Sequence, residues 1–146
     1  MYPIRILSAQ SLLKLGDASE ALPFLVNLMN DRSGNVREVA AYSLGHSEQS
    51  TAVDPLLMAM DDPANTMTFK ETLINSMSYI KDQRVDAKLQ SLLTDPTWET
   101  NPALFMALSR ECGQEALPLL SNQRERISDP KAISYLDLVI KGLGGK

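Results

Sequence analysis

The sequence is poor in the residues that build metal centres and disulfide frameworks. Its 146 residues include one cysteine, Cys112, and one histidine, His46. A structural zinc site takes about four ligands, mostly Cys and His, and a disulfide takes a pair of cysteines, so this chain alone can form neither. We therefore expect no metal and no other cofactor, and we predict no catalytic residue.

Long hydrophobic runs and an excess of positive charge are also missing. The longest unbroken apolar run, 103–108, has six residues, whereas a membrane span needs roughly 20. The net charge is −4; residues 1–62 hold 4 basic and 8 acidic side chains, and residues 63–146 hold 10 of each. Binding to phosphate backbones requires clustered Lys and Arg, so we expect neither a nucleic acid nor a membrane as partner. Residues 1–5 lack the basic stretch and apolar core of a secretory signal, which favours a cytoplasmic protein.

The period-two alternation of half-buried strands is absent, and a longer period takes its place. Two apolar columns recur every 31 or 32 residues. The first consists of Ala21, Val53, Val85 and Ala116. The second consists of Leu25, Leu57, Leu89 and Leu120. We expect both columns to be buried, because a repeat of this length is typical of helical hairpins that stack on their neighbours.

Helix-start signals and turn residues place two helices in each period. Capping boxes, in which a polar residue is followed three positions later by an acid, predict helix starts at Asp17, Asn35 and Thr68. The pair Asp129-Pro130 predicts the N-cap and first residue of a last helix. The prediction is one domain, 1–146, with hairpins at about 3–32, 33–64, 65–97 and 98–127 and a C-terminal helix at 129–143.

The second period has a recognisable pattern, VREVAAYSLG at 36–45 followed by AVDPLLMAMDD at 52–62. Together with ALPFL at 21–25, it resembles the HEAT repeat, specifically the short bacterial and archaeal form named after the phycobilisome lyases (PBS lyase HEAT-like repeats). The resemblance covers about residues 4–123 and is weaker in the third and fourth periods, where Ser78 replaces a glycine. It implies an all-α fold, a right-handed α-solenoid (alpha-alpha superhelix) of about four hairpins plus a C-terminal capping helix, with the second helices lining the concave side.

The resemblance implies less about function, because such repeats serve binding, scaffolding and occasionally catalysis. We expect a non-catalytic protein–protein interaction or scaffold module that binds a protein partner on the concave face. The alternative is an accessory or lyase-like subunit that acts on a chromophore-bearing or other protein partner, and a stand-alone enzyme is the third possibility. The chain itself is expected to be a monomer or a weak homodimer.

Residues of the second helices that the helical period turns to solvent are the candidate partner-binding residues. Val26 and Met58 are apolar where the period predicts polar side chains, and interfaces favour an apolar centre within a polar rim. The rim would consist of Asn27, Asn30 and Asp62. Tyr42, on the polar side of a first helix, is a further contact candidate. The alternative is that Val26 and Met58 are singly exposed apolar residues, which are common and have no function.

The remaining candidates have structural explanations. Asp31, Asp62 and Asp95 form an acidic column at the turns, which we expect to tie one repeat to the next rather than to bind a ligand. His46 is predicted to be a turn residue, and Cys112 a buried structural thiol. The two residues lie two repeats apart, and a repeat of a solenoid touches only its neighbours, so they are not expected to form a catalytic pair.

Overall fold

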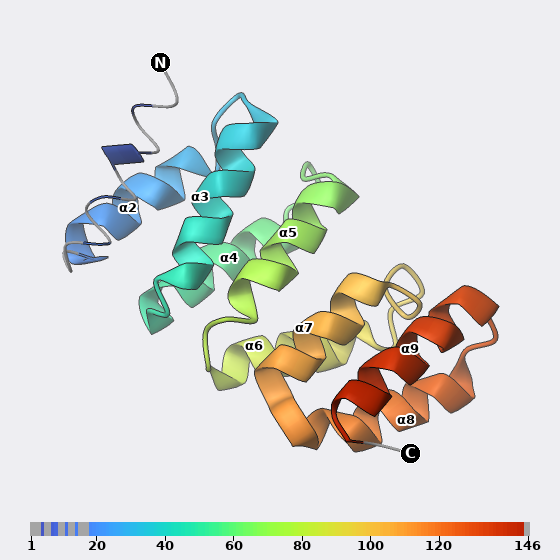
Figure 1. Cartoon of the computed structure of the whole chain (residues 1–146). Helices are drawn as coiled ribbons and strands as arrows, with labels where there is room; N and C mark the ends of the chain where they lie inside the picture. Colours follow the sequence, from blue (N-terminus) through green and yellow to red (C-terminus); the bar gives the residue numbers. More distant parts are fainter. Residues whose placement is uncertain (1–3, 5–6, 9–10, 12–13, 15–17, 145–146) are drawn as a thin grey trace. The chain divides into compact units, whose positions relative to one another are not determined.

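The computed structural model of the chain describes residues 4, 7, 8, 11, 14 and 18–144. Throughout this part of the chain the structure is all-α and contains no strand, as the sequence predicts. The α-helices are α2 (Ala18–Leu28), α3 (Gly34–His46), α4 (Val53–Asp61), α5 (Met67–Met77), α6 (Gln83–Leu92), α7 (Pro102–Cys112), α8 (Ala116–Arg126) and α9 (Pro130–Gly142), and two short 3-10 turns are η1 (Ser50–Ala52) and η2 (Gly113–Glu115) (Figure 1). The chain divides into two compact units, Met1–Asp82 and Gln83–Lys146. The handedness of the superhelix stays a prediction.

In the first unit, α3 packs against both α2 and α5, and α4 packs against α5. The helices α3 and α5 lie side by side and run in the same direction, which is how the first helices of consecutive hairpins stack (Figure 1). The largest fully buried side chains of this unit are Leu25, Leu44, Leu56, Leu73, Ile74, Met77 and Ile80. The column members Ala21, Val53 and Leu25 are also fully buried in this unit.

The close approach of α3 and α5 requires a glycine at one position. A Cβ atom on Gly45 would lie 2.1 Å from the carbonyl oxygen of Ser76, a distance that real contacts do not reach. The neighbour is backbone, so it cannot swing aside as a flexible side chain would. Gly45 ends the VREVAAYSLG pattern, and this contact gives that glycine a packing role.

In the second unit, α7 packs against α6, α8 and α9, and α8 also packs against α9. The largest fully buried side chains of this unit are Leu89, Leu104, Phe105, Leu108 and Leu120. Trp98, in the connection between α6 and α7, is also buried. The last helix starts as predicted, because Pro130 is its first residue and Asp129 Oδ1 accepts a hydrogen bond from the backbone N–H of Lys131 at 3.0 Å.

The helix starts correct two of the predicted capping boxes. The N-caps are Ser33 before α3 and Thr66 before α5, so Asn35 and Thr68 lie inside the first turn. Thr66 Oγ1 accepts a hydrogen bond from the backbone N–H of Phe69 at 3.2 Å, which satisfies one of the free N–H groups of the helix start. Polar residues followed by an acid are common throughout a first turn, so the pattern alone placed both starts two residues late. The third predicted capping residue, Asp17, lies outside the described residues.

One position of the second apolar column is also wrong. Leu25, Leu89 and Leu120 are fully buried, but Leu57 is only partly buried, and Leu56 takes the fully buried position in α4. Leu56 and Leu57 lie three and four positions after the buried Val53, and both spacings turn a residue toward the same side of a helix. The 32-residue spacing therefore could not distinguish Leu56 from Leu57.

Each aspartate of the acidic column closes its own turn. Asp31, Asp62 and Asp95 each accept, through Oδ1, a hydrogen bond of 2.9 Å from a backbone N–H two residues later, on Ser33, Ala64 and Thr97 respectively. A short carboxylate readily reaches the backbone of its own turn, and the expected role of these residues in tying one repeat to the next stays a prediction. The regular spacing of these aspartates follows from the repetition of the turn itself.

Candidate functional site: a groove between α2 and α4

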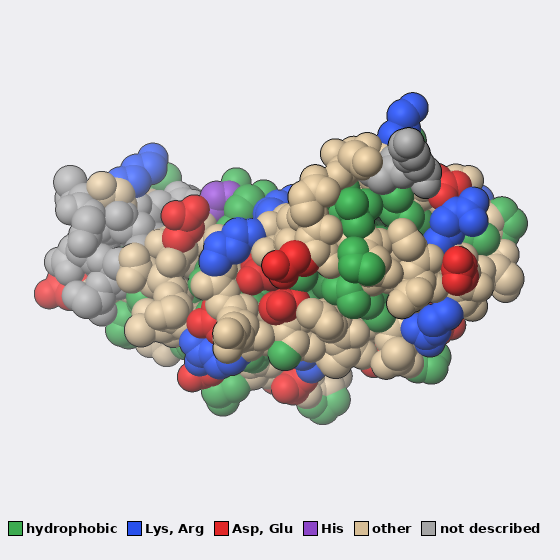
Figure 2. All heavy atoms as spheres, turned by 90° about the horizontal axis from the view of Figure 1, so that it is seen from below, with side chains coloured by type: hydrophobic (Ala, Val, Ile, Leu, Met, Phe, Trp, Pro, Cys, Tyr) green, Lys and Arg blue, Asp and Glu red, His purple; other side chains and the backbone are tan. Residues whose placement is uncertain are grey.

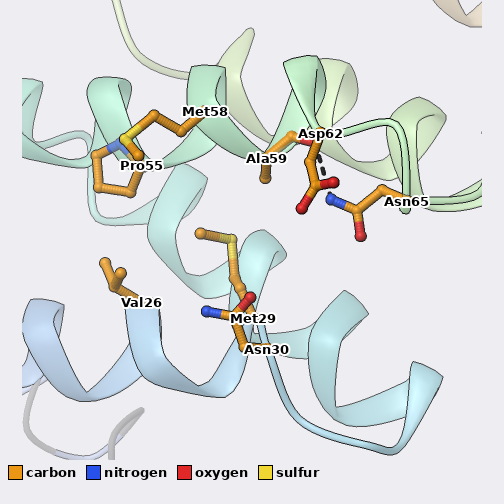
Figure 3. A pocket seen from close by; sticks show the side chains of 8 residues that line it. All are labelled: Val26, Met29, Asn30, Pro55, Met58, Ala59, Asp62 and Asn65. Carbon is orange, nitrogen blue, oxygen red and sulfur yellow. Dashed lines mark hydrogen bonds between the residues drawn. The ribbon is translucent and has the colours of Figure 1, made fainter.

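The second helices α2 and α4 of the first unit enclose a groove of about 240 Å³. They run in the same direction on its two sides (Figure 3). The lining residues are Val26, Met29 and Asn30 from α2 and the turn after it, and Pro55, Met58, Ala59, Asp62 and Asn65 from α4 and the turn after it. The groove is thus formed by equivalent segments of two consecutive repeats.

One end of the groove is apolar. Met58 is 73% exposed, more than any other large hydrophobic side chain among the described residues. Val26, Pro55 and Met58 lie together at this end, and Met29 points from α2 toward α4 (Figure 3). Met29 is 6% exposed, so it forms a floor rather than a rim. An exposed methionine beside other apolar side chains offers a flexible, polarizable contact surface.

The other end of the groove is polar and acidic. Asp62 and Asn65 lie together there, just beyond the C-terminal end of α4, and Asn30 lies across the groove beside Met29, just beyond the C-terminal end of α2 (Figure 3). Asn65 Nδ2 donates a hydrogen bond to the carbonyl oxygen of Ala59 at 2.8 Å, which fixes its amide group against α4. Asp62 is exposed, and its Oδ1 atom accepts from the backbone N–H of Ala64.

The structure brings four of the six candidate residues together in this groove: Val26, Asn30, Met58 and Asp62. Asn27 is exposed on α2 but does not line it. Pro55 and Ala59, which the period also turns to solvent, line the groove as well, and sequence reasoning missed the other two lining residues, Met29 and Asn65. Met29 lies three positions after Val26, a spacing that could have identified it. Asn65 lies in a turn, where helical spacing makes no prediction.

Tyr42 belongs to a different cluster, on α3. Its ring stacks on His46 with centroids 3.8 Å apart, and the Tyr79 ring lies 4.2 Å from His46 on another side. His46 Nδ1 is 3.0 Å from the carbonyl oxygen of Tyr42, a distance at which an Nδ1–H group donates a hydrogen bond. His46 was predicted to be a turn residue and is the last residue of α3. Its ring contacts the Tyr42 carbonyl group and the two tyrosine rings.

Cys112 lies in the second unit and is partly buried, whereas the sequence predicted a buried structural thiol. Its thiol donates a hydrogen bond to Asp86 Oδ1 at 3.1 Å, and Gln90 Nε2 donates to the same oxygen at 2.6 Å. Burial first, and then the hydrogen bond and negative charge of Asp86, raise the pKa of Cys112 to about 12. The thiolate is the nucleophilic form of cysteine, so this thiol is inert at neutral pH.

A second groove, of about 270 Å³, occupies the equivalent place between α6 and α8. It is lined by Gln90, Leu93, Thr94, Leu119, Asn122, Gln123, Glu125 and Arg126. Gln90 stands 32 positions after Met58, so a polar residue replaces the exposed methionine. Gln123 is 1% exposed, and its Nε2 atom donates to the carbonyl oxygens of Leu93 at 2.9 Å and Glu99 at 2.8 Å.

The surface shows no dominant charge on the face seen in Figure 2, where acidic and basic side chains are interspersed. Within the described ranges, no group of three or more His, Cys, Asp or Glu residues could hold a metal ion. None of the helices described is long and apolar enough to cross a membrane.

Helical hairpins in tandem, stacked first helix on first helix, define the class of α-helical repeat proteins. Residues 2–69 match the family model of HEAT repeats, the family that the sequence pattern resembles. A comparison with curated proteins finds no match. HEAT repeats generally mediate protein–protein interaction or scaffolding. The closer resemblance to repeats of the phycobilisome-lyase type stays a prediction.

Proposed function

We propose that the protein is a non-catalytic interaction or scaffold module that binds a protein partner in the groove between α2 and α4. The observation on which the proposal rests is the 73% exposure of Met58 at the rim of that groove. A single exposed apolar residue means little. Met58, however, lies beside Val26, Pro55 and Met29, so a partner can cover a continuous apolar surface.

The burial of Met58 by a partner would contribute measurably to affinity. Full burial of a methionine side chain contributes about 1.5–3 kcal/mol, so covering the exposed part of Met58 alone improves affinity by roughly tenfold or more. The neighbouring Asn30, Asp62 and Asn65 provide a polar rim that can pair with groups of the partner. An apolar centre with such a rim is the usual anatomy of a protein interface.

The two residues with catalytic potential support the non-catalytic part of the proposal. Cys112 is kept protonated by its surroundings, and His46 is held between two tyrosine rings. The α2–α4 groove itself contains neither a nucleophile of low pKa nor a histidine.

The test compares Met58→Glu with a control that makes the same chemical change elsewhere. Leu138 on α9 is 68% exposed, so Leu138→Glu also replaces an exposed apolar side chain with a carboxylate, but in the other unit. Each tagged full-length variant is used to capture proteins from the native cell, followed by mass spectrometry and titration of the captured protein. We expect a partner that binds the wild type and Leu138→Glu but not Met58→Glu, with both melting temperatures unchanged. Equal binding to all three proteins would remove the α2–α4 groove from the interface.

A further inference from the structure

We infer that the partner presents to the groove between α2 and α4 a peptide segment in which an apolar side chain lies next to a lysine or arginine. This inference rests on the proposed function and adds the chemistry of the partner to it. The apolar side chain would cover Val26, Pro55 and Met58, and the cation would meet Asp62 between the two asparagine amides.

The order of chemistry along the groove supports this assignment. Its apolar end and its polar end follow one another along α2 and α4 (Figure 3). A segment that fills only the apolar end leaves the Asp62 carboxylate beside the interface without a partner cation. A buried or half-buried carboxylate is costly unless it is paired, and a charged hydrogen bond to it is about twice as strong as a neutral one. The groove therefore favours an occupant with both features.

The charges of the two helices all have one sign. Neither α2 nor α4 contains a lysine or an arginine, whereas α2 contains Glu20, and α4 contains Asp54 and Asp61 and is followed by Asp62. Arg32, in the turn after α2, does not line the groove. Arg37 NH1 donates to the carbonyl oxygen of Asp31, in the turn after α2, at 2.7 Å, and its guanidinium lies 5.9 Å from the Phe69 ring centroid of α5; Arg37 does not line the groove either.

The helix dipoles act in the same direction as these carboxylates. Each helix C-terminus has the equivalent of about half a negative charge, which a lysine or arginine in the last turn normally offsets. Neither α2 nor α4 has a basic residue in its last turn, and both helices end at the polar end of the groove (Figure 3). In the second groove, by contrast, α8 has Arg124 and Arg126 in its last turn. Arg126 also lines the second groove, so a cation of the protein already lies there, whereas no lysine or arginine lines the α2–α4 groove.

The first experiment identifies the preferred chemistry with a defined probe. A phage-displayed library of random dodecapeptides is selected on the immobilised full-length protein, and each enriched peptide is tested on Met58→Glu and Leu138→Glu. We expect Met58-dependent peptides with an apolar residue within one helical turn of a Lys or Arg. Met58-dependent peptides without a basic residue would overturn this inference and leave the proposed function standing. If no enriched peptide depends on Met58, both fail.

The second experiment tests the role of Asp62 without disturbing its turn. Asp62→Asn keeps a side-chain oxygen that can accept from the backbone N–H of Ala64, but removes the charge. The matched control is Glu125→Gln, which neutralises a carboxylate in the α6–α8 groove. A synthetic peptide from the selection should bind Asp62→Asn about tenfold more weakly than the wild type, as loss of one charged hydrogen bond predicts, and Glu125→Gln unchanged. Added salt should weaken binding to the wild type more than to Asp62→Asn. Equal affinities for all three proteins would refute the pairing with Asp62.

Discussion

The groove between α2 and α4 and the groove between α6 and α8 are built at the same place in the repeat and differ in chemistry. In the first, the residue at the rim is the exposed Met58; in the second, it is Gln90, whose amide donates to Asp86. The second groove is also closed by Gln123, which binds two backbone carbonyls and accepts at Oε1 a hydrogen bond from Arg126 at 3.0 Å. At the rim position the second groove thus has an amide that bonds to the protein itself, whereas the first has an exposed apolar side chain.

This difference shows how a repeat separates structure from binding. Residues that face the interior keep the helices in place in both units, so the solvent-facing residues of the second helices can change without altering the fold. A methionine in one period and a glutamine in the next therefore give two grooves of similar volume with different side chains at the rim. Substitutions that act on only one unit test this separation.

The largest effect is expected from the core beneath the first groove. Leu56→Ala removes a fully buried side chain and should lower the free energy of unfolding by about 2–5 kcal/mol. Leu57→Ala should cost clearly less, because Leu57 is only partly buried. Leu89→Ala, at the position equivalent to Leu57 in the second unit, should again cost the full amount because Leu89 is fully buried. Urea denaturation of the three variants measures this, and equal losses at Leu56 and Leu57 would contradict the burial pattern of α4.

The next effect comes from the contact between α3 and α5 in the first unit. Gly45→Ala places a methyl group against the backbone of Ser76 and should destabilise the protein by about 3 kcal/mol, the upper end of the usual cost of overpacking. The control is Gly142→Ala at the end of α9, where an added Cβ atom meets nothing within 4 Å. That variant should be unchanged or slightly more stable, since alanine favours helix. Thermal melts of both variants provide the comparison, and an unchanged melting temperature of Gly45→Ala would show that α3 and α5 can move apart freely.

A smaller loss of stability is expected when the buried amide that lines the second groove is removed. Gln123→Leu replaces the amide side chain with an apolar one of similar volume and so removes the donor to Leu93 and Glu99, and we expect a loss of about 2 kcal/mol. Asn122→Leu, on the same helix but exposed, should change stability by less than about 0.5 kcal/mol. Urea denaturation distinguishes the two, and equal stability of both variants would mean that the Gln123 hydrogen bonds are replaced by water without cost.

The sequence predicted the helical hairpins because their apolar columns recur over several periods, and each column is reinforced by the next. It placed Asn35 and Thr68 as caps and Leu57 in the core wrongly, because helix starts and helix rotation depend on contacts that spacing does not reveal. Val26 and Met58 were recognisable as candidates because they are apolar on a face where the period predicts polar residues. Asn65 was not, because its place in the groove depends on a turn and a hydrogen bond to Ala59.

Tyr42 also shows what the sequence could and could not predict. Its place on the polar side of its helix was read correctly, and it is 48% exposed. Its ring, however, stacks on His46, and Tyr79 reaches His46 from beyond α5, a partner far away in the sequence. Residues brought together from separate helices therefore needed the structure, while residues on one helix face did not.

The smallest effect on stability near neutral pH concerns the hydrogen bonds of Cys112 and Gln90 to Asp86, in the second unit. Because the pKa of Cys112 is raised from 9.0 to about 12, the folded protein at pH 8 should contain about a thousandfold less thiolate than an ordinary cysteine would give. Alkylation by iodoacetamide, followed by mass spectrometry, should therefore be far slower for the folded protein than for the protein unfolded in urea. Asp86→Asn should restore only part of the rate, since burial is the larger cause of the shift and the carboxylate the second.

The same shift in the pKa of Cys112 predicts a pH dependence of stability. The folded state favours the protonated thiol, so this contribution to stability is complete below about pH 9 and is lost as the pH rises toward 12. Over that range the wild type should lose more stability than Cys112→Ala. If the folded protein were alkylated as fast as the unfolded protein, the thiol would not be held by Asp86.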